Sequence, residues 1–148
     1  MGMLRGNHPA RIDDKGRLKI PNGFRSLIET QFGAELFITS LAGEHVVIWP
    51  LAVWTEIERK LAAVPSTNPA KRRFLERVNY FGQIATMDKQ GRVLLPQVVR
   101  DPAGMVGDVS VLGQLNHLEV WNSKRLLDRF KREPFSEDDG KALSEFGI

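Results

Sequence analysis

The chain has 148 residues, of which 42% are hydrophobic and 26% charged, as is typical of a folded globular domain. It has no cysteine, which excludes disulfide bonds and cysteine-ligated metal sites, and its three histidines lack the spacing of a zinc site. We therefore expect no metal and no cofactor. No apolar run approaches the ~18 residues of a membrane span, and the first ten residues lack the apolar stretch of a secretion signal. We expect a cytoplasmic protein without a membrane partner.

The net charge is only +3, but the charges are unevenly distributed. Residues 1–75 hold 11 basic and 7 acidic side chains, whereas residues 76–148 hold 10 basic and 11 acidic ones. The basic surplus lies within residues 1–25. Together with a pI near 9.4, this clustering is the electrostatic signature of a polyanion partner. A basic surface that contacts only solvent is the alternative, and charge alone does not decide between the two.

In chain order, the first distinctive stretch is Ile12–Pro21, and it recurs 75 residues later as Met87–Pro96. Four positions are identical in the two copies: Asp13 and Asp88, Gly16 and Gly91, Arg17 and Arg92, Pro21 and Pro96. Further matches follow, Phe24-Arg25 with Val99-Arg100 and Val46–Trp49 with Leu118–Trp121. Each half has only about 70 residues and would bury a small core alone. We therefore predict two halves that share one core around a pseudo-two-fold axis.

Each copy predicts a strand, a tight turn, a second strand and a short helix. Asp13 and Asp88 suit the turn because an aspartate bonds the backbone two residues onward. Gly16 and Gly91 supply the positive φ that such a reversal needs. Polar and apolar residues then alternate over residues 17–20, as in a half-buried strand. The proline that follows ends the strand and starts a helix, predicted at residues 21–27 in the first copy.

The remaining elements follow from apolar patterning and turn residues. Strands are predicted at residues 36–39, 45–49, 81–87, 93–95, 108–112 and 117–121, with a turn at 113–116. Helices are predicted from Pro50 to Leu61, after an N-cap at Asn68, at residues 96–100, and from Ser123 onward. A tail helix starting near Ser136 is expected to be frayed or docked on a neighbour. The predicted boundaries are 3–65 and 81–133 for two modules, 66–80 for a connecting helix and 134–148 for the tail.

The two copies differ where Lys19 of the first corresponds to Leu94 of the second. A strand that is apolar on both faces is usually covered on both. We therefore expect the second copy to lie deeper in the protein or in an interface, and the first to face a ligand.

These motifs resemble the MraZ family, whose hallmark is a duplicated Asp-x-x-x-Arg, present here as Asp13…Arg17 and Asp88…Arg92. Other family-like stretches are Arg5-Gly6, Asn68–Arg73, Gly113–Asn116 and Glu119–Trp121. The resemblance implies an α+β, β-rich fold of two pseudo-repeated AbrB-like modules, which form a swapped-hairpin β-barrel with peripheral helices. It also implies a homo-oligomer that closes into a ring.

The resemblance further implies a sequence-specific DNA-binding transcriptional regulator associated with the nucleoid. The implied targets are promoter repeats upstream of its own gene and of a cell division and cell wall gene cluster. Lys15 and Arg17 are the leading candidates for contact with double-stranded DNA. The other candidates are Lys19, Arg5, Arg11, Lys89 and Arg92, with Asp13, Gly16, Asp88 and Gly91 as the structural motif. Arg17 could bind a guanine edge or a phosphate, or pair with Asp13, and for Arg92 we favour pairing with Asp88.

Two other functional classes are alternatives. One is an oligomeric scaffold whose basic face binds a different polyanion. A hydrolase could use Asp13 and Asp88 as paired carboxylates that share a proton. However, an arginine four residues from each aspartate should lower its pKa and keep it ionised, which opposes proton sharing. We therefore expect no enzymatic activity and no small-molecule substrate.

Overall fold

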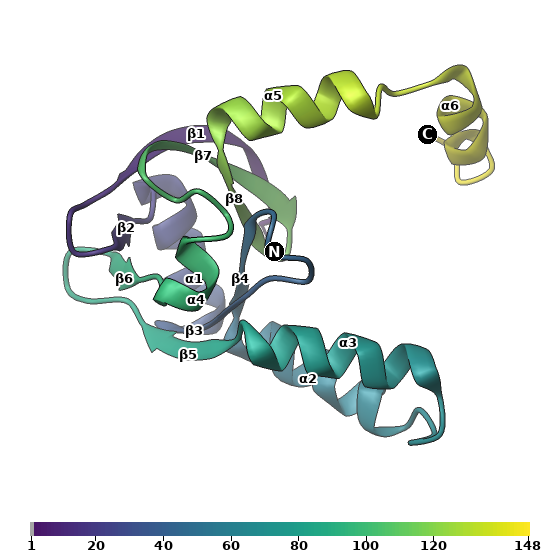
Figure 1. Ribbon diagram of the computed structural model, residues 1–148, viewed down its shortest axis with the longest axis horizontal. Helices are drawn as coiled ribbons and strands as arrows, with labels where there is room; N and C mark the ends of the chain where they lie inside the picture. The colour runs from purple at the N-terminus through teal and green to yellow at the C-terminus, as the bar shows by residue number, and fades with distance from the viewer. Residues whose placement is uncertain (1) are drawn as a thin grey trace.

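The computed structural model describes residues 2–148 as one antiparallel sheet with six helices (Figure 1). Its strands are β1 Leu4–Ile12, β2 Arg17–Lys19, β3 Glu35–Thr39, β4 Val46–Pro50, β5 Gln83–Thr86, β6 Arg92–Leu94, β7 Gly107–Leu115 and β8 Leu118–Asn122. Its helices are α1 Asn22–Phe32, α2 Leu51–Ala62, α3 Pro69–Tyr80, α4 Gln97–Arg100, α5 Ser123–Arg132 and α6 Glu137–Ser144. Of these, α2, α3, α5 and α6 extend away from the sheet on one side (Figure 1). The predicted β-rich α+β class is confirmed.

The strand order β5-β3-β4-β8-β7-β1-β2-β6 interleaves the two halves of the chain. β1 of the first half pairs with β7 of the second, from Leu4 opposite Leu115 to Ile12 opposite Gly107. In the same way β5 of the second half pairs with β3 of the first. The two end strands of the sheet, β5 and β6, lie close together, so the sheet nearly closes into a barrel (Figure 1). The predicted exchange of strands between the halves is confirmed.

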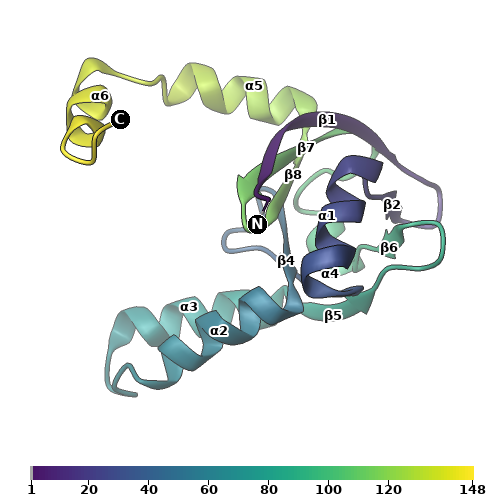
Figure 2. The same cartoon turned by 180° about the vertical axis from the view of Figure 1, so that it is seen from behind.

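A pseudo-two-fold axis relates the halves, because the strands that correspond in the repeat pair with each other. β4 pairs with β8, with Val47 opposite Glu119, and β2 pairs with β6, with Leu18 opposite Val93. The helices obey the same relation. Figure 1 shows α4 toward the viewer and α1 behind the strands, and Figure 2, from behind, shows α1 in front.

The hydrophobic core is shared by both halves, as predicted. Buried side chains from the two copies of the repeat contact one another in a single cluster, including Leu18, Ile20, Ile28, Ile48, Val93, Leu95, Val99 and Leu118. The alternation predicted for residues 17–20 accounts for this, since Leu18 and Ile20 lie inside while Arg17 and Lys19 lie outside. Neither half could retain this core without the other.

The peripheral helices lie on the side of the molecule opposite β2 and β6 (Figure 1). α2 and α3 form an antiparallel pair around buried Trp54, which stacks on Phe37. The predicted cap of α3 is confirmed, because the Asn68 side chain accepts hydrogen bonds from the backbone amides of residues 70 and 71. α6 has a capping box but no buried residue. Within residues 2–148, no helix is long and apolar enough to cross a membrane.

The strand predicted at residues 108–112 is longer in the structure. β7 continues to Leu115, and the reversal follows at Leu115, which has a φ of +71°. Gly113 therefore does not form the predicted turn. It lies opposite Gly6 of β1, so close to the β1 backbone that a Cβ would collide with Leu4 and Arg5. Glycine is needed here for close approach of two strands rather than for a turn.

Candidate nucleic-acid interface

The carboxylate of Asp13 organises the first turn. Its Oδ1 accepts hydrogen bonds from the backbone amides of Lys15 at 3.0 Å and Arg17 at 2.8 Å. Its Oδ2 accepts a third hydrogen bond from Arg17 Nε at 2.8 Å. The bond from the Arg17 amide, supported by the guanidinium, lowers the pKa of Asp13, so the carboxylate stays ionised at neutral pH. One side chain thus fixes both the turn and the direction of the Arg17 guanidinium.

The second turn repeats this arrangement. Asp88 Oδ1 accepts hydrogen bonds from the amides of Gln90 at 2.9 Å and Arg92 at 2.8 Å, and Oδ2 accepts one from Arg92 Nε at 2.9 Å. The Arg92 amide likewise lowers the pKa of Asp88. Each aspartate is therefore ionised and bonded to its own arginine, as predicted, and neither is suited to share a proton with the other.

Backbone hydrogen bonds cross from each copy to the other. The Ile20 amide donates to the Gly91 carbonyl at 2.9 Å, and the Leu95 amide donates to the Gly16 carbonyl at 3.0 Å. These reciprocal bonds extend the β2–β6 pair into both turns. The two Asp-x-x-x-Arg motifs, 75 residues apart in sequence, therefore form one continuous two-stranded ribbon.

Two further arginines hold the turns from the opposite half. Arg25 of α1 donates from Nη2 to the Lys89 carbonyl at 2.7 Å, and its Nε also bonds Glu29. Arg100 of α4 donates a hydrogen bond from Nη1 to the Lys15 carbonyl at 3.4 Å. Arg25 and Arg100 correspond in the sequence repeat, but neither was predicted to lie at the site. No local pattern could have predicted this, because each arginine reaches a turn in the other half of the chain.

Gly91 has a φ of +76°, and a Cβ at this position would lie 2.6 Å from Arg25 Cδ. Gly16 has a φ of +82° and would collide with Arg100 in the same way. Each glycine thus provides both the left-handed backbone of the turn and the space for the arginine that crosses over it.

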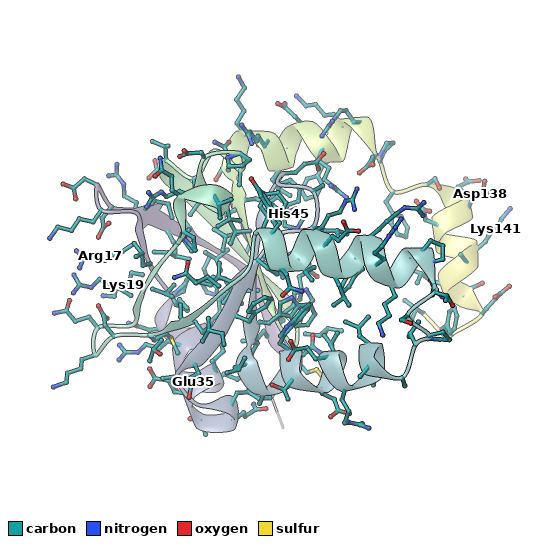
Figure 3. All side chains as sticks on the ribbon, turned by 60° about the horizontal axis from the view of Figure 1, so that its bottom comes forward. Arg17, Lys19, Glu35, His45, Asp138 and Lys141 are labelled. Carbon is teal, nitrogen blue, oxygen red and sulfur yellow. The ribbon has the colours of Figure 1, made fainter. Side chains whose placement is uncertain are left out.

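The outward face of the β2–β6 ribbon is defined by four side chains. Arg17 lies opposite Leu94, and Lys19 lies opposite Arg92, while Leu18 and Val93 between them are buried. We call these four outward residues, with Lys15 and Lys89 of the adjacent turns, the ribbon face. Figure 3 shows Arg17 and Lys19 at one end of the molecule, with Asp138 and Lys141 of α6 at the other.

The exposure of Leu94 contradicts one part of what was expected for the second copy, that it lies deeper in the protein. The Leu94 side chain is 53% exposed, so the second copy does not lie deeper within this chain than the first. The pseudo-two-fold axis explains this, because it gives Leu94 the same surroundings as Lys19. Whether another molecule covers Leu94 stays a prediction.

The ribbon face offers cations to a ligand. Among residues 2–148, Lys15, Lys19 and Lys89 form no ion pair. Arg17 and Arg92 bond their aspartates through Nε, and no partner within the described residues is found for their Nη atoms. Each guanidinium can therefore donate both Nη groups outward in an orientation set by its aspartate.

The other two candidates lie apart from this face or at its margin. Arg11 lines a cleft of about 350 Å³ together with Lys19 and Pro21, although it also pairs with Asp108 at 3.2 Å. Arg5 lies opposite Gln114 near the far end of β1, about 20 Å along the strand from the first turn. The structure brings five of the seven candidates together, places Arg11 beside them, and leaves Arg5 outside.

The described residues contain no cluster of three or more His, Asp or Glu side chains that could hold a metal ion. The chemistry available at the ribbon face is that of oriented guanidinium and ammonium groups. Such groups bind phosphate, and guanidinium also binds the O6 and N7 atoms of guanine through two hydrogen bonds.

Comparison with known proteins agrees with the duplicated motif. The family model described as "MraZ protein, putative antitoxin-like" matches residues 3–77 and 83–146. A protein named Transcriptional regulator MraZ from Acidobacterium capsulatum is 49% identical over 146 residues, which are 99% of this chain and 100% of the relative. The proteins of the same name from Koribacter versatilis and Tolumonas auensis are 45% and 33% identical, over 99% and 97% of this chain and 100% and 91% of theirs. The chain belongs to the MraZ family.

Proposed function

We propose that this chain is a sequence-specific, DNA-binding transcriptional regulator whose ribbon face contacts duplex DNA. Its relatives are named transcriptional regulators, which supports the regulatory part of the proposal. The observation that carries the DNA contact is the pair of Asp-oriented arginines on one two-stranded ribbon. The major groove of B-DNA admits a two-stranded β-ribbon, and the side chains on its outer face then reach the base edges.

The side chains of the ribbon face have different tasks in this proposal. Arg17 reads a guanine edge or clamps a phosphate with its Nη groups, while Asp13 holds its Nε. Lys15 and Lys89 lie on the turns at the two ends of the ribbon and bind backbone phosphates. These phosphate contacts supply affinity that depends on salt but carry no sequence information. The function has no catalytic step.

We also propose that several copies act together as a closed ring. Exposed apolar side chains on α5 and in the tail support subunit contacts on the side away from the ribbon face: Leu127, Phe130, Phe135, Phe146 and Ile148. A few basic contacts per subunit give weak binding, whereas linked subunits on repeated DNA sites gain avidity from a high effective concentration. The proposed sites are promoter repeats upstream of the protein's own gene and of a cell division and cell wall gene cluster. The protein then acts at the nucleoid.

Fluorescence anisotropy tests this function with a labelled duplex that carries the repeats upstream of the gene and a scrambled duplex of equal length. The parent protein should prefer the repeats. The double variant Lys15→Ala/Arg17→Ala should lose this preference while light scattering shows an unchanged particle mass.

The matched control is Arg59→Ala/Lys60→Ala on α2. It removes the same two residue types from an exposed surface and breaks only an exposed pair with Glu56, which should contribute little to stability. The control should bind like the parent. Equal binding of both duplexes by the parent would refute sequence-specific regulation and leave a scaffold for a different polyanion.

A further inference from the structure

Leu94 is the one apolar side chain on the ribbon face. It lies directly opposite Arg17 and two residues after Arg92, so cations flank it both across and along the ribbon. Single exposed leucines are common on protein surfaces and need no explanation by themselves. Leu94 is informative because of its position, which the pseudo-two-fold axis makes equivalent to that of Lys19.

Any duplex that lies against Arg17 and Lys19 also lies against Leu94. The four outward side chains come from directly opposed positions, and opposed Cβ atoms on antiparallel strands are about 5 Å apart. That separation is close to the rise of one to two base pairs. On such a duplex, Leu94 would face a base pair one or two steps from the one that Arg17 contacts.

The major groove carries one prominent apolar group, the C5-methyl group of thymine. Leu94 cannot donate or accept a hydrogen bond, so it gains nothing from guanine O6, adenine N6 or cytosine N4. Against a polar base edge it would displace water without replacing the hydrogen bonds that the water made. Contact with a thymine methyl group buries two apolar surfaces together.

A contact with another protein subunit fits the same surroundings less well. A partner that covered Leu94 closely would also cover the guanidinium groups of Arg17 and Arg92, whose Nη atoms have no partner within residues 2–148. Both guanidinium groups are paired with their aspartates through Nε, but burial of their Nη donors without acceptors would be unfavourable. A nucleic acid avoids this penalty because it brings phosphates and base acceptors to the same face.

We propose that Leu94 determines specificity by contact with the methyl group of a thymine, one or two base pairs from the pair that Arg17 contacts. The inference rests on the proposed function, and it adds a second base to the one that Arg17 would recognise. Since Lys19 occupies the equivalent place in the first half, the two ends of the ribbon face favour different bases. The preferred site is therefore asymmetric.

The test replaces thymine by deoxyuridine, which removes only the methyl group, one strand at a time in the repeat duplex. Anisotropy gives the affinity of the parent and of Leu94→Ala for each duplex. For the parent, at least one replacement should weaken binding roughly fourfold per engaged subunit, the factor expected for one buried methyl group. For Leu94→Ala the same replacement should have no effect, although binding to the thymine duplex is weaker than that of the parent.

Leu41→Ala is the matched control, because Leu41 is also an exposed leucine but lies outside the ribbon face. It should retain the parent's sensitivity to deoxyuridine. Equal sensitivity in the parent and Leu94→Ala, or no sensitivity in the parent, would refute the inference. So would a changed particle mass of Leu94→Ala with unchanged DNA binding, which would assign Leu94 to a subunit contact.

The two proposals fail separately in this experiment. A parent that prefers the repeats over scrambled DNA but ignores the methyl groups overturns only the role of Leu94. A parent that does not distinguish the two duplexes overturns the proposed function and this inference together.

Discussion

Gly91→Ala tests whether the two halves support each other's turns. Alanine at a φ of +76° is strained, and its Cβ would lie 2.6 Å from Arg25 Cδ and 3.0 Å from Arg25 Nε. The arginine would have to move and give up its 2.7 Å hydrogen bond to the Lys89 carbonyl. The substitution therefore combines a local backbone effect with the loss of a contact between the halves.

The two contributions have different sizes. The left-handed backbone should cost about 1–2 kcal/mol for a non-glycine residue, and the hydrogen bond of Arg25 contributes about 1 kcal/mol. Gly91→Ala should therefore lower the free energy of unfolding by about 2–3 kcal/mol. In an Arg25→Ala background only the backbone strain remains, about 1–2 kcal/mol. Gly107→Ala is the control, because Gly107 has a φ of +68° with no atom near its added Cβ.

The assay is urea denaturation followed by tryptophan fluorescence at one fixed protein concentration. A double-mutant cycle of Gly91→Ala and Arg25→Ala should give a coupling of about 1 kcal/mol, while Gly107→Ala and Arg25→Ala should be additive. Equal losses of unfolding free energy for Gly91→Ala with and without Arg25 would show that the two halves do not support each other here. The glycine would then serve only its own turn.

Three further results are expected. Arg17→Lys keeps the charge but loses the bidentate hydrogen-bond donor, so the preference for repeats over scrambled DNA should fall by about 1–3 kcal/mol while the salt dependence of binding stays unchanged. If anisotropy showed an unchanged preference, Arg17 would contact only phosphate. Deletion of residues 134–148 should lower the number of subunits per particle, which light scattering gives once the mass of the deleted residues is allowed for, if the tail docks on a neighbouring copy. An unchanged number of subunits would contradict that docking. Burial lowers the pKa of His45 and of His117 from 6.5, so the unfolded chain binds protons that the folded chain excludes. The free energy of unfolding should then fall as the pH drops below about 6.5. In the double variant His45→Gln/His117→Gln, urea titrations at several pH values should show that the free energy of unfolding depends less steeply on pH.

Local signals in the sequence were sufficient for much of the fold. The Asp-x-x-Gly-Arg turns, the alternation after them and the cap at Asn68 each depend on residues within a few positions, and all occur as predicted. The repeat itself indicated the pseudo-two-fold axis and the shared core. The motifs also supplied the DNA-contact candidates, but it is the structure that brings five of them together on neighbouring turns and strands.

What the sequence did not show depends on contacts between distant segments. The pairing of β1 with β7 sets the length of β7, so Gly113 was misread as a turn residue when it allows two strands to approach. Arg25 and Arg100 form hydrogen bonds with turns 64 and 85 residues away in the sequence. A pattern within one half of the chain cannot predict such contacts. Leu94 does not lie deeper within this chain than Lys19, because the two positions are equivalent about the axis and the pattern of one strand does not show this.

The joining of both halves in one chain has a consequence for how such a protein can change. In a barrel made of two identical chains, every substitution alters both sides of the binding surface at once. Here β2 and β6 are separate segments of one chain and are encoded separately. A substitution such as lysine to leucine therefore alters only one of the two strands of the ribbon. If the ribbon face contacts DNA as proposed, one side can be adapted to a base while the other keeps its attraction for the sugar–phosphate backbone. A subunit with two such unlike sides would then bind an asymmetric DNA site in a single orientation.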